Sequence, residues 1–188
     1  MNLPATGAAG SGDPLPIPVE RLGEADLPQV RDLAQRVWPV SYAEMLSPGQ
    51  IDYMLKRMYS LERLREDLRS GVVFEWPVRD GVPIGYLATS CDRSAPGGPV
   101  LFLHKLYLLP EVQGRGLGGR LLDHVLRAAA DLGCRRVRLN VNKANARAIA
   151  CYRRRGFDIE CSVVNDIGGG FVMDDHVMAR PMAGAGSA

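Results

Sequence analysis

The residues best suited to chemistry form a glycine-rich segment, residues 113–119, which reads QGRGLGG. It follows an apolar run at residues 100–109 and opens an amphipathic helix expected over residues 117–132. Glycines let the backbone approach a ligand closely, and the N–H groups at a helix N-terminus lie at the positive end of the helix dipole. The segment therefore predicts a phosphate-binding turn.

Two common nucleotide-binding loops fit this segment poorly. The loop of nucleotide triphosphatases needs Lys-Ser or Lys-Thr after its last glycine, and neither dipeptide follows here. The dinucleotide pattern G-x-G-x-x-G is matched by Gly114, Gly116 and Gly119. That pattern requires an acidic residue about 20 positions further on, and residues 138–142 (RLNVN) contain none. A dinucleotide-dependent oxidoreductase remains an alternative with weaker support.

A third pattern, Q-x-x-G-x-G, is matched by Gln113, Gly116 and Gly118. A second motif follows at residues 142–157, N-x-x-N-A-x-A-x-x-x-Y-x-x-x-G-F. With both motifs in this order, residues 17–180 resemble the GNAT superfamily of acetyl-CoA-dependent N-acetyltransferases, and more weakly its polyamine-acetyltransferase-like branch. The resemblance implies transfer of an acetyl group from acetyl-CoA to a small-molecule or peptide primary amine, by direct attack in a ternary complex. A non-catalytic acyl-CoA-binding module on the same fold is the alternative.

The resemblance also implies which residues contact the co-substrate. In the family, the Q-x-x-G-x-G turn holds the coenzyme A pyrophosphate, and the preceding strand diverges from its neighbour and binds the pantetheine through its backbone. The implied cofactor-binding residues are Leu106, Tyr107, Leu108, Gln113, Gly114, Arg115, Gly116, Leu117, Gly118, Gly119, Asn145 and Tyr152. Asn145 also suits the N-cap of the helix that it precedes, and the two roles are compatible.

Two residues are the candidate catalytic groups. By resemblance, Tyr152 donates a proton to the departing thiolate as general acid, whereas the structural alternative is a core aromatic residue beside Phe157. His104 stands where many family members carry a glutamate, and a histidine can accept the proton of the attacking ammonium directly or through water. A half-buried sheet histidine is the alternative for His104.

Four acidic residues are further candidates near the reaction. Glu75 and Glu111 are weaker candidates for the general base. Asp174 and Asp175 either line the acceptor side, where they would attract a cation, or belong to a solvated turn. Cys151 precedes Tyr152 but lies about 100° away from it around the helix, so no acyl-enzyme is expected.

The surrounding pattern predicts the elements that position these groups. A short strand at residues 17–22, helices between residues 24 and 68 (the first ended by Pro39) and a hairpin around residues 79–81 precede the glycine turn. Strands at residues 136–141, 157–164 and 171–179 and a helix at 145–154 follow it. We expect an α+β fold: a GNAT-like mixed, mostly antiparallel sheet of about six or seven strands flanked by helices on both faces.

Composition limits the remaining possibilities. The 188 residues suit one domain at residues 17–180, with a disordered lead-in at 1–16 and a flexible tail at 181–188. A net charge of +2 does not favour nucleic acid or membrane partners. The four cysteines form no C-x-x-C pair, which favours free thiols in the cytoplasm and no metal site. A homodimer is possible by analogy with the family.

Overall fold

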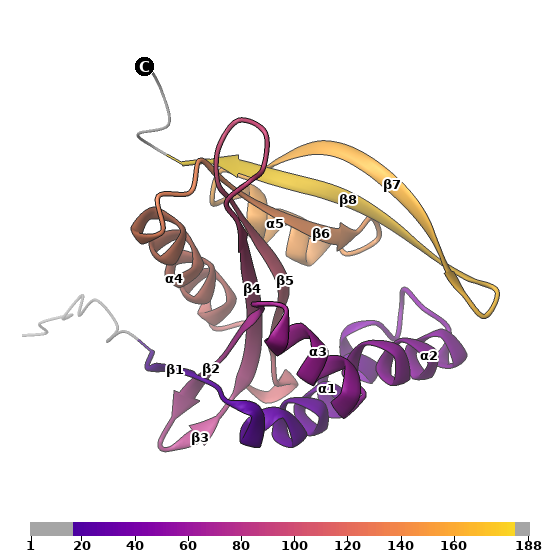
Figure 1. Ribbon diagram of the computed structural model, residues 1–188. Coiled ribbons are helices and arrows are strands. Elements are labelled where there is room, and N and C mark those ends of the chain that lie inside the picture. The colour runs from indigo at the N-terminus through magenta and orange to yellow at the C-terminus, as the bar shows by residue number, and fades with distance from the viewer. Residues whose placement is uncertain (1–16, 183–188) are drawn as a thin grey trace, which may run out of the picture.

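A twisted sheet in the order β1-β2-β4-β5-β6-β8-β7 forms the centre of the computed structural model (Figure 1). The structure describes residues 17–182, so the predicted lead-in at 1–16 and residues 183–188 of the predicted tail lie outside the described residues. The strands are β1 (Val19–Arg21), β2 (Val73–Arg79), β3 (Val82–Pro83), β4 (Gly85–Asp92), β5 (Val100–Leu108), β6 (Arg136–Asn142), β7 (Asp158–Gly168) and β8 (Phe171–Pro181).

The predicted fold class is confirmed. Among residues 17–182, β5 and β6 form the one parallel pair, and the other neighbours are antiparallel. The short β3 adds an extra pairing to β2 beside the seven strands of the main order. The sheet is therefore mixed and mostly antiparallel, as expected.

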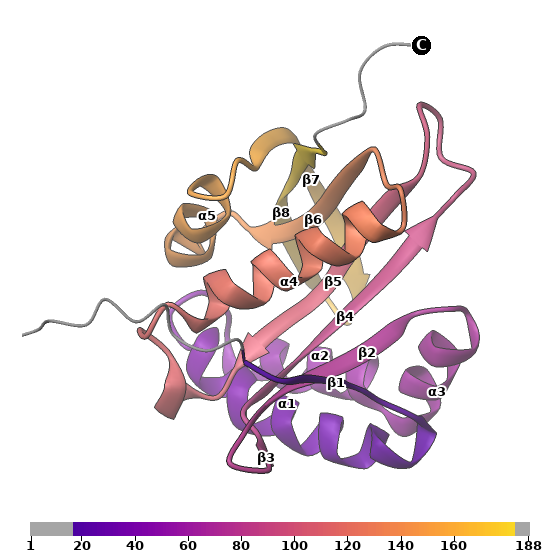
Figure 2. The ribbon, with the colours of Figure 1, turned by 90° about the vertical axis from the view of Figure 1, so that its left-hand side faces the viewer.

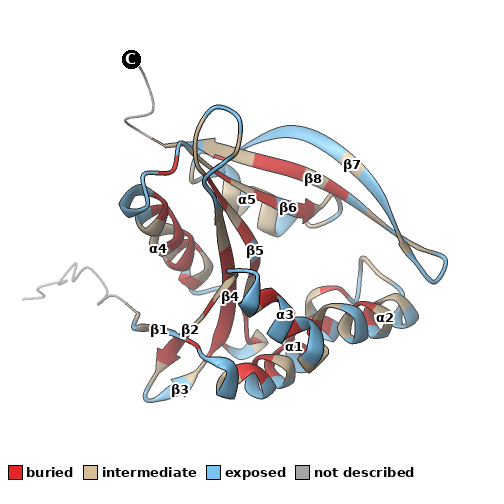
Figure 3. Cartoon of the chain, viewed as in Figure 1, coloured by how far each residue is buried: buried red, intermediate tan, exposed pale blue. Residues whose placement is uncertain are grey.

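Five α-helices cover the two faces of the sheet (Figure 2). One face carries α1 (Leu27–Ser41), α2 (Pro48–Tyr59) and α3 (Leu61–Arg69), and the other carries α4 (Leu117–Asp131) and α5 (Ala146–Arg153). Buried residues follow the sheet centre and the inner sides of α1 and α4 (Figure 3). None of the helices within residues 17–182 has the length and apolar character needed to cross a bilayer.

Three boundaries differ from the sequence prediction. Helix α1 passes through Pro39 to Ser41, because the proline lies in the last turn, where it removes little hydrogen bonding, and the N–H of Tyr42 still donates to the Trp38 carbonyl at 3.0 Å. The first strand is shorter than residues 17–22. Strand β8 extends into the predicted tail, to Pro181, and Met182 donates its N–H to the Arg135 carbonyl at 2.9 Å.

The decisive feature of the sheet is that β5 and β6 separate. They pair only from Val100↔Arg136 to Leu103↔Leu139, although β5 continues to Leu108 and β6 to Asn142. On the other side of β5, the register with β4 skips His104, which forms a β-bulge. A bulge increases local twist, and this turns the end of β5 away from β6. On the side that faces β6, the backbone of residues 104–108 therefore lines a gap without a strand partner, while residues 105–108 remain paired with β4.

Gly85 holds the end of β5 in place. It pairs with Leu108, and a Cβ at position 85 would overlap the carbonyl oxygen of Tyr107. We expect Gly85→Ala to lower the free energy of unfolding by about 3 kcal/mol, because a backbone atom cannot move aside as a flexible side chain can. Urea unfolding followed by circular dichroism measures this.

Gly49→Ala is the matched control for Gly85→Ala. Gly49 lies in α2, and an added Cβ meets only the Phe171 ring, at 3.7 Å. This substitution should leave stability unchanged or raise it by up to about 1 kcal/mol. Equal destabilisation by the two variants would contradict the close approach at Gly85.

Candidate active site

The glycine turn opens at the end of β5 and is exposed. Gly114 (φ 80°) and Gly116 (φ 74°) have left-handed backbone conformations, and Gly116 is the N-cap of α4. A Cβ at either position would have no heavy atom within 4 Å. The glycines are thus required by conformation rather than by packing. The first N–H groups of α4 lack partners within the helix, which suits them to an anion.

The last two glycines of the segment have different surroundings. Gly118 has an ordinary negative φ, and the nearest atom to a Cβ there would be Leu108 Cδ1 at 4.0 Å. Gly119 is buried, its N–H donates to the Gly116 carbonyl at 3.1 Å, and a Cβ would overlap the Arg155 guanidinium. Arg155 in turn contacts both carboxylate oxygens of Asp123, at 3.0 and 3.2 Å. Gly119 therefore makes room for an ion pair between α4 and the end of α5.

Gln113 joins three parts of the site. Its Nε2 donates to the Leu108 carbonyl at 2.9 Å, and its Oε1 accepts from Arg147 Nη1 at 3.1 Å. The side chain thus ties the end of β5 to α5 across the turn. Arg147 was not among the predicted residues, although it follows Asn145 by two positions in the second motif. It brings a cation to the turn, which also carries the exposed Arg115.

Asn145 is the N-cap of α5. Its Oδ1 accepts from the Ala148 N–H at 3.1 Å, which confirms the capping interpretation. Asn142, the first residue of the same motif, accepts from the Ala144 N–H at 2.9 Å. The motif therefore fixes the turn from β6 into α5.

Tyr152 lies near the end of α5 and packs against Phe157, with ring centroids 5.9 Å apart. Burial raises the pKa of its phenol well above the usual value, and the nearby Tyr42 and Cys151 raise it further. The hydroxyl therefore keeps its proton at any physiological pH. Tyr152 therefore packs in the core and also has a proton that it can donate.

Tyr107 connects the end of β5 to the helices. Its hydroxyl lies 2.9 Å from that of Tyr42 on α1, and its ring packs against Trp38 and Tyr86. Tyr86 donates to the Tyr59 hydroxyl at 2.8 Å. The Tyr107 side chain is therefore occupied on the α1–α3 face.

His104 occupies the β-bulge and is exposed. Its Nε2 lies 2.7 Å from Ser90 Oγ, and its ring stacks near Phe102. The sheet shields part of the ring, and this shielding is the main cause that lowers the pKa of His104, followed by the charge of Lys105, against the opposing effect of Asp67. The imidazole is therefore neutral near pH 7, the form that can accept a proton.

Lys105, the next residue, was not singled out by the sequence analysis. It is 6% exposed, and its Nζ lies 3.5 Å from Asp67 Oδ2 on α3 and over the rings of Tyr59 and Phe74. Burial lowers the pKa of Lys105, and Asp67 opposes that effect. The sequence signal that could have identified Lys105 is a single lysine within a mostly apolar strand. The pair attaches α3 to β5 directly beside His104.

The acidic candidates lie in different places. Glu75 contacts His124 of α4 at 3.1 Å, and Glu111 contacts Arg36 at 2.8 Å on the surface. Asp174 is half exposed and pairs with Lys143. Asp175 is 6% exposed in β8, so the solvated-turn interpretation is wrong for it: antiparallel pairing to β6 and β7 buries it. The described residues bring together no group of three or more His, Cys, Asp or Glu side chains that would suit a metal.

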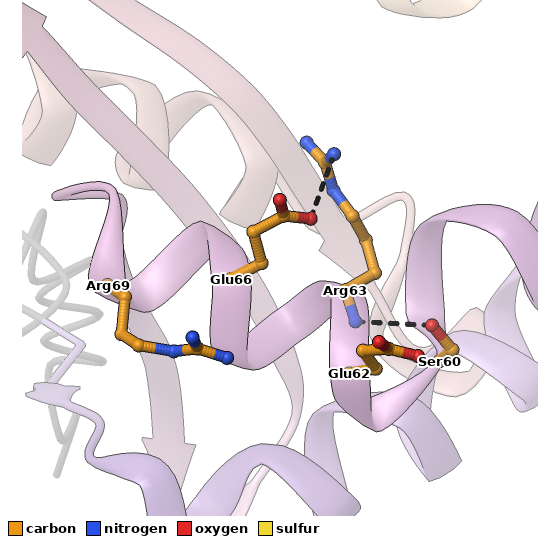
Figure 4. A pocket seen from close by; sticks show the side chains of 5 residues that line it. All are labelled: Ser60, Glu62, Arg63, Glu66 and Arg69. Atoms are coloured by element: carbon orange, nitrogen blue, oxygen red, sulfur yellow. Dashed lines mark hydrogen bonds and ion pairs between the residues drawn. The ribbon is translucent and has the colours of Figure 1, made fainter.

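A hollow on the outside of α3 is separate from this site (Figure 4). Ser60, Glu62, Arg63, Glu66 and Arg69 line it, and Arg63 contacts Glu66 there. All five residues belong to α3 or its N-cap. The hollow contains none of the predicted site residues.

Comparison with known proteins agrees with this geometry. The family model described as the Acetyltransferase (GNAT) family matches residues 27–157. An uncharacterized N-acetyltransferase of Mycobacterium tuberculosis is 32% identical over 162 residues, which cover 84% of this chain and 98% of that protein. A spermidine N(1)-acetyltransferase of Thermoplasma acidophilum is 26% identical over 149 residues, 77% of this chain and 89% of that protein.

Solved structures share the fold. The PaiA N-acetyltransferase of Thermoplasma acidophilum, solved in complex with coenzyme A, superposes with a TM-score of 0.71 at 24% identity, over 89% of this chain and 99% of that one. The ribosomal-protein-S18-alanine N-acetyltransferase of Escherichia coli gives a TM-score of 0.67 at 21% identity, over 90% of this chain and 96% of that one. With a family match over most of its length and 32% identity over 162 residues to a relative that it covers almost completely, the chain belongs to the GNAT family and is an N-acetyltransferase.

Proposed function

We propose that this acetyltransferase acts by direct attack of a primary amine on acetyl-CoA, both bound at the gap between β5 and β6. The observation that carries the proposal is the end of β5–β6 pairing at Leu103↔Leu139, on the strand that leads to the exposed glycine turn. The turn suits the pyrophosphate, with Arg115 and Arg147 close by. The β6-facing side of Leu106–Leu108, which has no strand partner, suits the pantetheine and offers an N–H group to a developing oxyanion.

The residues account for both proton transfers. The amine nitrogen bonds to the acetyl carbon while the carbon–sulfur bond breaks. His104 accepts the proton that the amine loses, directly or through water, and Tyr152 gives its proton to the thiolate sulfur. The nitrogen loses its second proton to solvent as the amide forms, the tyrosinate regains one from solvent, and His104 releases the proton that it accepted, so each turnover releases one proton. His104 is exposed on the α1–α3 side, and Tyr152 comes from α5 on the opposite side of the sheet.

The acceptor belongs to the primary amines. Among the relatives, the Thermoplasma acidophilum protein is named for spermidine and a Bos taurus protein for thialysine, and both names describe amines. The second match covers only 39% of this chain. These names support a small amine acceptor.

Tyr152→Phe tests the general acid. We expect kcat to fall by about 100-fold or more, since the phenyl ring keeps the packing against Phe157 but has no proton to donate. Thiol release from acetyl-CoA measures turnover, and calorimetry should show unchanged affinity for coenzyme A. Full turnover by this variant would remove Tyr152 from the mechanism. A wild-type protein that binds coenzyme A without turnover on any amine would be a binding module.

Cys151→Ala tests direct attack. Cys151 is a half-buried free thiol on the same helix, and an acyl-enzyme route would need such a nucleophile. We expect kcat and coenzyme A affinity to stay within about twofold of the wild type, since the substitution removes no group that the direct route uses. A loss of turnover with folding and coenzyme A binding intact would contradict direct attack.

His104→Gln tests the general base through pH. In the wild type, kcat/KM should fall on the acidic side as His104 becomes protonated, and this limb should lie below pH 6.5, the usual histidine value of about 6.5 being lowered here. In the variant, the limb should disappear and kcat/KM should fall by about 100-fold. His124→Gln, on the α4 face, is the control and should keep the limb. An unchanged limb in His104→Gln would assign the base elsewhere.

A further inference from the structure

Asp175 is a buried carboxylate with an unsatisfied oxygen. Its side chain is 6% exposed, and its Oδ1 is fully buried without a hydrogen-bond partner among residues 17–182. Burial raises the pKa of this carboxyl, and Asp174 raises it further, whereas His176 and Lys143 oppose the shift. Leaving a buried acceptor unpaired is unfavourable, so such groups in folded proteins usually have a ligand or a function.

The two basic side chains whose charges act on Asp175 have other partners. Lys143 contacts Asp174, and His176 Nδ1 lies 2.9 Å from Ser162 Oγ. Asp174, one residue from Asp175, is thus exposed and paired, whereas Asp175 is buried and lacks such a partner at Oδ1. No cation from residues 17–182 therefore contacts Asp175 Oδ1.

Asp175 lies on the α1–α3 side of the sheet, next to the gap. It pairs with Asn142, the last residue of β6 beyond its separation from β5. Burial is the main cause that raises the pKa of Tyr42, and the charge of Asp175 raises it further; the Tyr42 hydroxyl meets that of Tyr107 on β5. Helix α2 reaches the far part of β8, where Gln50 Nε2 donates to the Val172 carbonyl at 2.7 Å (Figure 1). Asp175, Tyr42 and α2 thus lie on the same side of the sheet.

The distance between Asp175 and the gap determines which nitrogen of the acceptor Asp175 can bind. Strand β6 lies between β8 and the gap, so Asp175 is displaced sideways by at least one interstrand spacing, about 4.8 Å. An attacking nitrogen must instead come within about 3–3.5 Å of the acetyl carbon. A group held by Asp175 is therefore distinct from the attacking nitrogen.

We propose that Asp175 binds a second, non-reacting ammonium group of the acceptor, so that the substrates are diamines or polyamines. This inference rests on the proposed function of the gap. The second ammonium keeps its charge throughout acetyl transfer, so the interaction contributes to binding before and during the reaction. Asp175 is accordingly a specificity-determining residue, and its loss should act mainly on KM.

A matched pair of acceptors tests this role. Putrescine and butylamine share a four-carbon chain, and only putrescine has a second ammonium. The wild type should prefer putrescine in kcat/KM by about 10- to 100-fold, the usual worth of a hydrogen bond to a charged group. In Asp175→Asn, that preference should vanish through a rise in the KM for putrescine, with butylamine turnover unchanged. Asp174→Asn, the control, should keep the preference.

Thermal unfolding with coenzyme A present supplies a readout without turnover. Putrescine should raise the Tm of the wild type and of Asp174→Asn, and leave that of Asp175→Asn unchanged. Without putrescine, Asp175→Asn should be at least as stable as the wild type, because an unpaired buried charge is removed; marked destabilisation would indicate a structural role instead. If no amine is acetylated, the proposed function fails, while the Tm shift still decides the Asp175 site. Preference or stabilisation that persists in Asp175→Asn overturns the inference, as does a wild type that shows neither.

Discussion

The rest of the site depends on the separation of β5 from β6 after Leu103 and Leu139. A parallel pair inside a sheet normally satisfies its backbone groups along its whole length. Here the ladder stops while both strands continue, so backbone donors and acceptors are left without a strand partner in the middle of the sheet. The bulge at His104 supplies the twist that opens the gap, and the close approach of Gly85 keeps the far end of β5 on β4.

The two faces of the sheet contribute different chemistry to this gap. The α4–α5 face provides the glycine turn, the Gln113–Arg147 bridge and the Tyr152 hydroxyl, to which the proposal assigns the acetyl donor. The α1–α3 face provides His104 and Asp175, to which the proposals assign the acceptor. In this proposal, donor and acceptor meet at the gap in the sheet, and the surface hollow on α3 contains none of these groups.

Buried polar contacts on the α1–α3 face hold this arrangement. The Lys105–Asp67 pair and the hydroxyl contact of Tyr42 with Tyr107 connect β5 to α3 and α1. A buried pair is costly to break, because the remaining charge would be left without a partner. Exposed pairs such as Lys56–Asp52 contribute little by comparison. The buried polar residues therefore fix where β5 lies relative to the helices that form the acceptor side.

The sequence by itself determined the fold class, the glycine turn, the Asn145 cap and the hairpin at residues 79–81, because each depends on local spacing and backbone preference. Only the tertiary structure separated Gly114 and Gly116, which need left-handed conformations, from Gly119, which makes room for Arg155. Likewise it alone revealed where the β5–β6 pairing ends, the Arg147 bridge, the buried Lys105 and the unpaired oxygen of Asp175. These features arise from contacts between segments far apart in the chain, and no local pattern of residues encodes which partner each side chain meets.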